Sequence, residues 1–168
     1  MIIKPPVIEE IEAFIFDFDG VLTNNKVHID QNGKELVSCS RADGLAFDAL
    51  RKLKKPTYIL SSEKNSVVEA RAKKLKVLSI QGVSDKVKSI NQLVMSEGLN
   101  INNIFYVGND LNDYYAMKLC GYSACPSNSH EKIKLISNFH LNSKGGDGVV
   151  RELLEEIIGI DLIEILYN

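Results

Sequence analysis

The stretch AFIFDFDG, residues 13–20, decides the fold of this chain. Its first four residues form an unbroken apolar run, which is typical of a short strand buried on both faces. Asp17 and Asp19 leave the strand at positions i and i+2, and Gly20 completes a turn that stops it. We therefore expect a buried strand whose carboxyl end presents two carboxylates near one pocket.

The rest of the chain repeats this alternation of apolar runs and amphipathic segments. Strands alternating with helices predict a parallel sheet with helices on both faces, a three-layer Rossmann-like α/β fold. In such sheets the ligand site lies beyond the carboxyl ends of the strands. The expected strands are 58–60, 77–80, 104–107 and 122–124, and the expected helices are 43–55, 66–75, Ser84–Gly98, 114–119 and 149–158, followed by an apolar tail at 160–167.

One small insertion interrupts this order. Gln31-Asn32-Gly33 separates two alternating segments, and Asn-Gly in that place favours a β-hairpin that pairs Val27 and Ile29 with Leu36 and Val37. The insertion, about 24–40, is too small to be a cap domain. Since no linker or repeat is visible, we expect residues 1–168 to form a single domain.

Composition limits the class of protein. The chain is 45% hydrophobic and 25% charged, with a net charge of −2 from acidic and basic residues that are mixed along it. This pattern argues against nucleic-acid binding, and no apolar run reaches the length of about 20 residues that a membrane span needs. Residues 1–11 lack the apolar core of a signal peptide. With three cysteines expected as reduced thiols (Cys39, Cys120, Cys125), a cytoplasmic protein is predicted.

Asp17 and Asp19 indicate metal-dependent chemistry. Their mutual repulsion is costly unless a cation or a proton intervenes, and Mg²⁺ binds oxygen ligands while keeping positions open for phosphate oxygens. The first carboxylate could then attack phosphorus and the second could protonate the leaving oxygen. The alternative is an ordinary surface Asp-Phe-Asp-Gly turn.

Three further features support phosphate chemistry. Ser61 ends a strand, where its hydroxyl can hold a phosphate oxygen, although it could be only a turn residue. Lys86 lies in the first turn of a helix, a place unfavourable for a cation unless it reaches an anion or simply stays solvated. The loop 108–113 supplies oxygen ligands after another strand, and its alternative is an Asx-rich helix cap.

Together and in this order, these elements resemble the haloacid dehalogenase superfamily over nearly the whole chain. The resemblance implies that Asp17 is the nucleophile that forms an aspartyl-phosphate and that Asp19 is the general acid/base. Ser61 and Lys86 would hold the transferring phosphoryl group. Mg²⁺ would be bound by the Asp17 carboxylate, the Asp19 backbone carbonyl and the Asn109 side chain.

Asn109 departs from the superfamily, which usually has aspartate there. An amide oxygen can ligate magnesium but carries no charge, so metal affinity should fall. Asp110 or Asp113 could compensate, and Asp113 is expected to orient the metal's water shell from outside.

The hairpin and the small size resemble the capless branch that dephosphorylates 3-deoxy-2-keto sugar acids. The matching stretches are 81–86, 108–113 and 145–152. The resemblance implies a homotetramer in which hairpins and neighbouring subunits complete the active site, and a partner subunit is expected to exclude water in place of a cap. The apolar side chains of the hairpin and of the tail also predict an interface with another subunit.

The substrate is expected to be an acidic sugar phosphate. Ser62, Glu63, Arg71 and Lys74 are the candidate substrate-binding residues. Their pattern resembles the nine-carbon 9-phosphate enzymes more than the eight-carbon 8-phosphate enzymes, and the alternative is a solvated helix face.

A second class of function stays open. A related domain occurs behind sugar-acid cytidylyltransferases, where it drives tetramerisation with little or no catalysis. Asn109 keeps this alternative open, whereas the presence of all four of Asp17, Asp19, Ser61 and Lys86 argues against it. A nucleotide-binding switch protein is not expected, because no Gly-rich phosphate loop is present.

Overall fold

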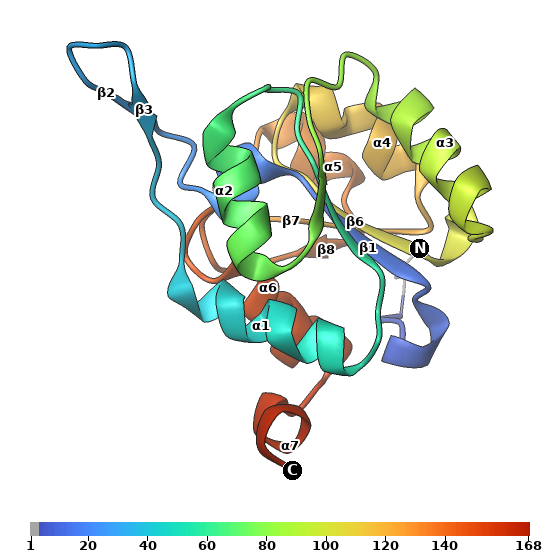
Figure 1. Cartoon of the computed structure of the whole chain (residues 1–168). Helices are drawn as coiled ribbons and strands as arrows, with labels where there is room; N and C mark the ends of the chain where they lie inside the picture. The colour runs from blue at the N-terminus through green and yellow to red at the C-terminus, as the bar shows by residue number, and fades with distance from the viewer. Residues whose placement is uncertain (1–3) are drawn as a thin grey trace.

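A six-stranded parallel sheet forms the centre of the computed structural model, which describes residues 4–168 (Figure 1). The strand order is β5-β4-β1-β6-β7-β8, so the strand of the opening stretch lies in the interior. Residues 1–11 are expected not to be a signal peptide, and the first three of them lie outside the described residues. Within residues 4–168, no helix is both long and apolar enough to cross a bilayer. The sheet strands are β1 (Ala13–Phe16), β4 (Thr57–Leu60), β5 (Leu78–Ile80), β6 (Ile104–Val107), β7 (Tyr122–Cys125) and β8 (Phe139–His140).

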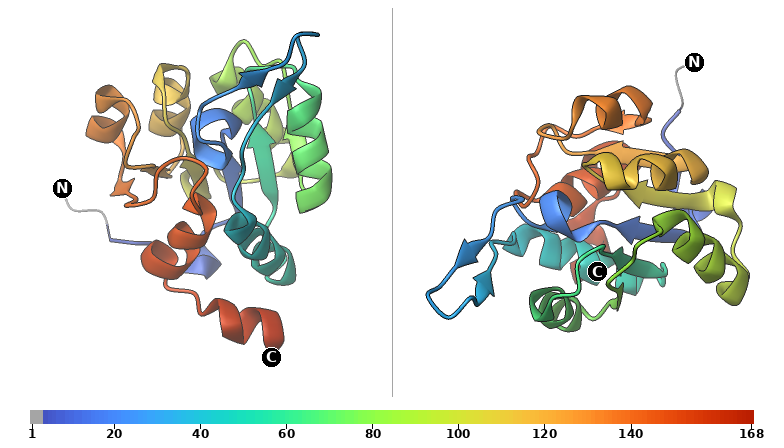
Figure 2. Two further views of the ribbon diagram at one scale, coloured as in Figure 1. Left: turned by 90° about the vertical axis from the view of Figure 1, so that its left-hand side faces the viewer. Right: turned by 90° about the horizontal axis from the view of Figure 1, so that it is seen from above.

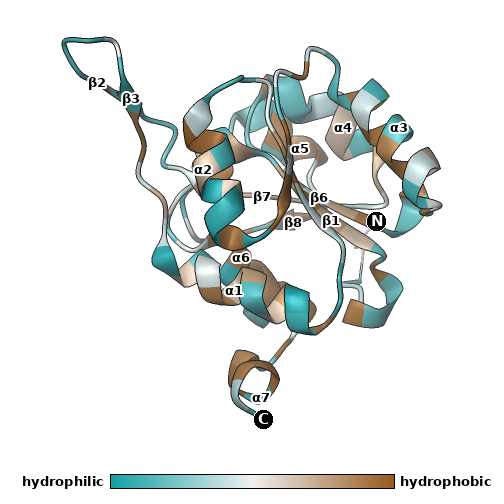
Figure 3. Ribbon diagram, in the orientation of Figure 1, coloured by the Kyte–Doolittle hydropathy of each residue, from teal (hydrophilic) through white to brown (hydrophobic). Residues whose placement is uncertain are grey.

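Helices cover both faces of the sheet, as the three-layer prediction requires. Phe14 and Phe16 pack into one core and Ile15 into another, since successive side chains of β1 point to opposite faces. Figure 3 shows the hydrophobic residues gathered in these central strands. The first core is closed by α1 (Arg41–Lys52), α2 (Ser66–Leu75), α6 (Val149–Glu152) with its continuation Leu153–Ile158, and α7 (Leu162–Tyr167); the second is closed by α3 (Lys86–Glu97), α4 (Tyr114–Leu119) and α5 (Glu131–Ile136).

Three local expectations need correction. The side chain of Asp85, rather than that of Ser84, caps α3, because Asp85 Oδ1 accepts a hydrogen bond from the Lys88 amide at 2.9 Å. Helix α1 begins at Arg41, two residues before the expected start, since Ser40 caps it. Helix α5 and strand β8 were not predicted from the sequence.

The hairpin projects from the body of the molecule (Figures 1 and 2). Strands β2 (His28–Ile29) and β3 (Glu35–Leu36) pair antiparallel, with His28 opposite Leu36 and Ile29 opposite Glu35. The expected hairpin is present, but Ile29 pairs with Glu35 rather than with Leu36 or Val37. Ile29 and Leu36 are 65% and 55% exposed, so the hairpin buries little of its apolar surface within this chain.

The apolar tail is partly covered by the chain itself. Helix α7 packs against α1 and buries Leu162, and Lys52 Nζ donates to the Leu166 carbonyl at 2.6 Å. Ile163 and Tyr167 remain 71% exposed. Only the outer face of this helix is therefore available to a partner.

Candidate active site

The chain turns sharply directly after β1. Gly20 has a φ of +83°, which L side chains rarely adopt, and its amide donates to Thr23 Oγ1 at 3.2 Å. This reversal brings both Asp17 and Asp19 to the carboxyl end of the sheet.

A glycine-rich loop, residues 145–148, packs against this turn. A β-carbon on Gly145 would collide with the carbonyl oxygen of Gly20 and lie 2.9 Å from that of Thr23, so only glycine fits. The Gly146 amide donates to the Val21 carbonyl at 2.9 Å. Loop 145–148 therefore supports from behind the turn that carries Asp19.

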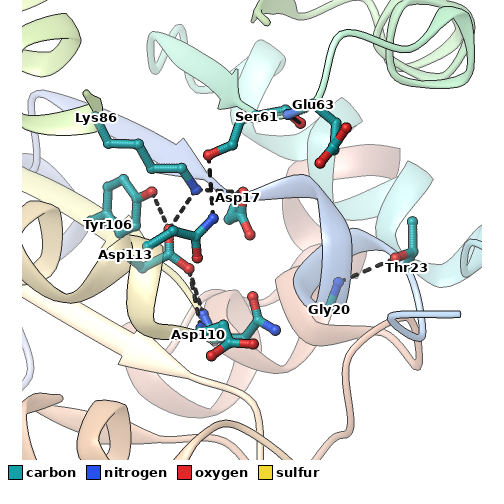
Figure 4. Close-up of polar contacts among 12 residues, drawn as sticks. Asp17, Gly20, Thr23, Ser61, Glu63, Lys86, Tyr106, Asp110 and Asp113 are labelled. Atoms are coloured by element: carbon teal, nitrogen blue, oxygen red, sulfur yellow. Dashed lines mark hydrogen bonds and ion pairs between the residues drawn. The ribbon is translucent and has the colours of Figure 1, made fainter. Parts of the chain in front are cut away.

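Lys86 links two buried carboxylates. Its Nζ donates to Asp17 Oδ1 at 2.7 Å and to Asp113 Oδ1 at 2.6 Å, and all three side chains are nearly inaccessible to solvent (Figure 4). Asp113 also accepts hydrogen bonds from the Tyr106 hydroxyl at 2.7 Å and the Asn109 amide at 2.8 Å. Asp113 thus positions Lys86 and the loop that carries Asn109.

The single positive charge of Lys86 does not neutralise the negative charges of the carboxylates around it. Burial and, second, the negative charge of Asp113 raise the pKa of Asp17 to about 7, against the opposing effect of Lys86. Burial also raises the pKa of Asp19, with the charges of Glu63 and Glu35 adding to the effect. The site therefore favours a bound cation or a bound proton.

The oxygen donors fit a magnesium ion. One end of the Asn109 amide lies 3.1 Å from Asp17 Oδ2 and 2.8 Å from the Asp19 carbonyl oxygen. With nitrogen at that end, the amide donates to both oxygens. With oxygen there, the separations match the spacing of about 2.9 Å between adjacent octahedral ligands whose bonds to Mg²⁺ are about 2.0–2.1 Å long.

Of the three groups that would hold the ion, only the Asp17 carboxylate is charged. Within residues 4–168 no group of three or more His, Cys, Asp or Glu side chains is arranged to hold a metal. The set instead combines a carboxylate, a backbone carbonyl and an amide. Asp113 lies behind it, and Asp110 Oδ1 accepts from the Leu111 amide at 2.7 Å.

A cleft of about 580 Å³ opens above Asp17. Ser61 is almost fully buried at the end of β4, and its Oγ accepts from the Glu63 amide at 3.2 Å. The hairpin of the same chain forms one wall. The lining residues are Asp17, Phe18, Asp19, Asn25, Val27, Glu35, Val37, Ser61, Ser62, Glu63, Asn65, Val67, Val68, Asn109, Asp110, Leu111 and Asn112.

The structure does not bring all the predicted substrate-binding residues to this cleft. Ser62 and Glu63 line it, whereas Arg71 and Lys74 do not. Arg71 instead donates to the Ser40 carbonyl at 2.7 Å, and Lys74 is exposed on α2.

Three residues around the site were not predicted from the sequence. Tyr106, in the middle of β6, gave one usable signal, because a buried tyrosine hydroxyl needs a hydrogen-bond partner. Glu35 and Asn65 gave none, since they meet only when the hairpin folds beside α2.

The sequence profile of the haloacid dehalogenase-like hydrolases matches residues 47–153, more than half of the chain. The chain belongs to this family. The predicted family and the Rossmann-like fold are therefore confirmed.

Relatives of this hydrolase indicate its branch. The 3-deoxy-D-manno-octulosonate 8-phosphate phosphatases KdsC of Salmonella typhi and of Escherichia coli K12 are each 28% identical over 151 residues, 89% of this chain and 80% of theirs. These relatives confirm the predicted enzyme class, a phosphatase of the capless branch.

Solved structures of other hydrolases of this family are also similar to this chain. A family member from Streptomyces avermitilis is 38% identical with a TM-score of 0.90, covering 94% of this chain and 90% of its own. The 3-deoxy-D-manno-octulosonate 8-phosphate phosphatase of Moraxella catarrhalis, in complex with a magnesium ion, a phosphate ion and KDO, is 27% identical with a TM-score of 0.85. That match covers 93% of this chain and 87% of the other.

Proposed function

We propose that this protein is a magnesium-dependent phosphatase that hydrolyses an acidic 3-deoxy-2-keto sugar phosphate through an aspartyl-phosphate on Asp17. The observation that carries the proposal is the placement of Asp17, whose two oxygens face Lys86 Nζ and the Asn109 amide respectively. The Moraxella catarrhalis enzyme, which holds magnesium and phosphate ions, supports this cofactor and this chemistry.

In the first step a carboxylate oxygen of Asp17 attacks phosphorus and the bond to the sugar oxygen breaks. Lys86 and Ser61 hold the phosphoryl oxygens during transfer. Asp19 gives its proton to the leaving sugar oxygen, and burial, which raises the pKa of Asp19, favours the protonated form that this step needs. When bound, magnesium neutralises negative charge shared between the carboxylate and the phosphate.

In the second step water attacks the aspartyl-phosphate. Asp19, now ionised, accepts a proton from this water, so phosphate is released and both aspartates return to their starting states. The hairpin wall and a neighbouring subunit exclude bulk water from the intermediate.

The substrate class follows from the KdsC relatives, whose substrate is an eight-carbon 8-phosphate. We favour a nine-carbon 9-phosphate for this chain, because Glu63 lines the cleft and matches the pattern of the nine-carbon enzymes. Arg71 and Lys74 lie away from the cleft of their own chain, so in this proposal they contact substrate from a neighbouring subunit.

The proposed active form is a cytoplasmic homotetramer of single-domain subunits. The exposed side chains of Ile29 and Leu36 on the hairpin and of Ile163 and Tyr167 on α7 support an interface. All three cysteines are free thiols, as a reducing compartment requires. Sedimentation at micromolar concentration tests the assembly, and a fully active monomer would contradict it.

A phosphate-release screen tests the function. The purified protein is offered eight- and nine-carbon sugar-acid phosphates, neutral sugar phosphates and p-nitrophenyl phosphate, with Mg²⁺ or with EDTA. We expect the highest kcat/KM for a sugar-acid phosphate, and no turnover with EDTA. A protein inactive on every ester would instead support the oligomerisation module beside a cytidylyltransferase.

A further inference from the structure

The cleft above Asp17 is lined by five carboxylates and, among its lining residues, by no lysine or arginine. Three of these carboxylates, those of Asp17, Asp19 and Asp110, lie at the end where phosphate and metal would bind. The other two, Glu35 and Glu63, come from the hairpin and from the loop after β4. An anionic group bound beside them would be repelled, whereas hydroxyl groups could donate hydrogen bonds to them.

Glu35 is directed into the cleft by the strand that carries it. Side chains alternate along β3, so Glu35 and Val37 line the cleft while Leu36 is 55% exposed on the other side. The hairpin is thus a wall whose inner face presents one carboxylate.

Asn65 fixes the position of that carboxylate. Its Nδ2 donates to Glu35 Oε2, and its Oδ1 accepts from the Val67 amide at 3.0 Å at the start of α2. Because both ends of the amide are engaged, its orientation is set by the helix cap. Within residues 4–168 Glu35 Oε1 accepts no hydrogen bond, so this oxygen remains available to a ligand.

We propose that Glu35, positioned by Asn65, is a specificity-determining residue that accepts hydrogen bonds from hydroxyls on the substrate's carbon chain beside the phosphate. This inference rests on the proposed function. It agrees with the layout of an octulosonate 8-phosphate, in which the carboxylate and the phosphate lie at opposite ends of the chain. The hydroxylated part passes the acidic walls, and the carboxylate lies beyond them.

The test compares two esters. For 3-deoxy-D-manno-octulosonate 8-phosphate, Glu35→Gln should raise KM by about tenfold, because charged hydrogen-bond acceptors are replaced by weaker neutral ones. For p-nitrophenyl phosphate, which carries no hydroxyl beside its phosphate, KM should stay within about twofold of the wild-type value. Glu69→Gln, an exposed change on α2, is the matched control and should alter neither KM.

A second variant tests the positioning role. Asn65→Ser keeps a residue that can cap α2 but removes the donor to Glu35. Its KM for the sugar phosphate should rise by a similar factor, and the double variant with Glu35→Gln should rise no further. Fully multiplicative effects would overturn the coupling of the two residues.

The outcomes separate this inference from the proposed function. If the wild-type protein hydrolyses the sugar phosphate but Glu35→Gln leaves its KM unchanged, the role of Glu35 is overturned and the function stands. An equal rise in KM for both esters overturns specificity in the same way. If the wild-type protein hydrolyses neither these two esters nor a nine-carbon 9-phosphate, the proposed function fails and the inference fails with it.

Discussion

Nζ of Lys86 lies 2.7 Å from Oδ1 of Asp17, with both side chains buried at the end of β1. The same ammonium contacts Asp113 at 2.6 Å. Lys86 therefore stabilises the negative charges of Asp17 and Asp113 in the absence of a metal ion.

Replacing Lys86 should reveal this stabilisation. Lys86→Gln leaves two buried carboxylates without their shared cation and should lower the free energy of unfolding by about 3–5 kcal/mol. Urea denaturation of the metal-free protein measures the effect. Lys88→Gln, an exposed change on the same helix, should cost less than about 0.5 kcal/mol. Equal stabilities of the two variants would contradict the buried contact.

Asp17→Asn should abolish phosphate release. The amide keeps the size of the side chain but cannot attack phosphorus, so kcat should fall below about one thousandth of the wild-type value. Phosphate release is measured beside circular dichroism, which should show an unchanged fold. Activity within tenfold of wild type, free of contaminating phosphatase, would refute the covalent mechanism.

Asn109→Asp should have opposite effects with and without metal. A carboxylate about 3 Å from Asp17 Oδ2 adds repulsion, so the metal-free protein should unfold at a lower temperature. With metal it adds a charged ligand, so the magnesium midpoint of activity should fall by about tenfold. Asn112→Asp adds the same charge to the cleft lining away from these ligands and is the control. An unchanged midpoint would mean that position 109 is not a ligand.

Asp43 should give stability a defined pH dependence. Asp43 is 1% exposed, its Oδ1 accepts from the Val150 amide at 2.8 Å, and burial raises its pKa from 3.8 to about 6. The native state therefore holds a proton that the unfolded chain loses near pH 4, so stability should fall as pH rises from about 4 to about 6. The decline attributable to this group is about 3 kcal/mol.

The test of this pH dependence is urea denaturation of the metal-free protein at pH 4 and pH 7. Asp43→Asn should lose that part of the decline, whereas Asp48→Asn, a change at a half-exposed side chain on α1, should retain it. Asp17 also contributes to the pH dependence of stability, and it does so equally in the wild type and in both variants. Parallel pH profiles for wild type and Asp43→Asn would show that Asp43 ionises normally.

Gly145→Ala should damage the site from a distance. The new methyl group meets the backbone at Gly20 and Thr23, which cannot move without shifting the turn that carries Asp19. We expect a loss of at least about 2 kcal/mol in unfolding free energy and of most activity. Gly44→Ala, in α1 with open space around it, should stabilise by about 0.5–1 kcal/mol. A Gly145→Ala protein as stable and active as wild type would show that loop 145–148 can shift to accept a β-carbon.

The sequence predicted the sheet and the positions of its polar ends because each depends on a local pattern. The apolar run before Asp17 and the run before Asn109 are long enough to be identified as strands without knowledge of the fold. By contrast, β8 has only two residues and exists because Phe139 pairs with Ala124. A pairing of that kind leaves no local pattern to predict it.

The roles of individual polar residues were harder to predict for the same reason. The position of Lys86 in the sequence indicated that it binds an anion, but not that two carboxylates share it. The contact between Glu35 and Asn65 joins residues 30 positions apart in separate elements. Helix periodicity placed Arg71 and Lys74 on one helix but could not show that this face turns away from the cleft.

The close packing of Gly145 on Gly20 also orders events during synthesis. Asp17 and its turn leave the ribosome early, yet the loop that supports them is made 125 positions later. A nascent chain that ends before this loop carries Asp17 without the loop that supports the turn bearing Asp19. The complete surroundings of Asp17 and Asp19 therefore form only after residue 145 has been synthesised.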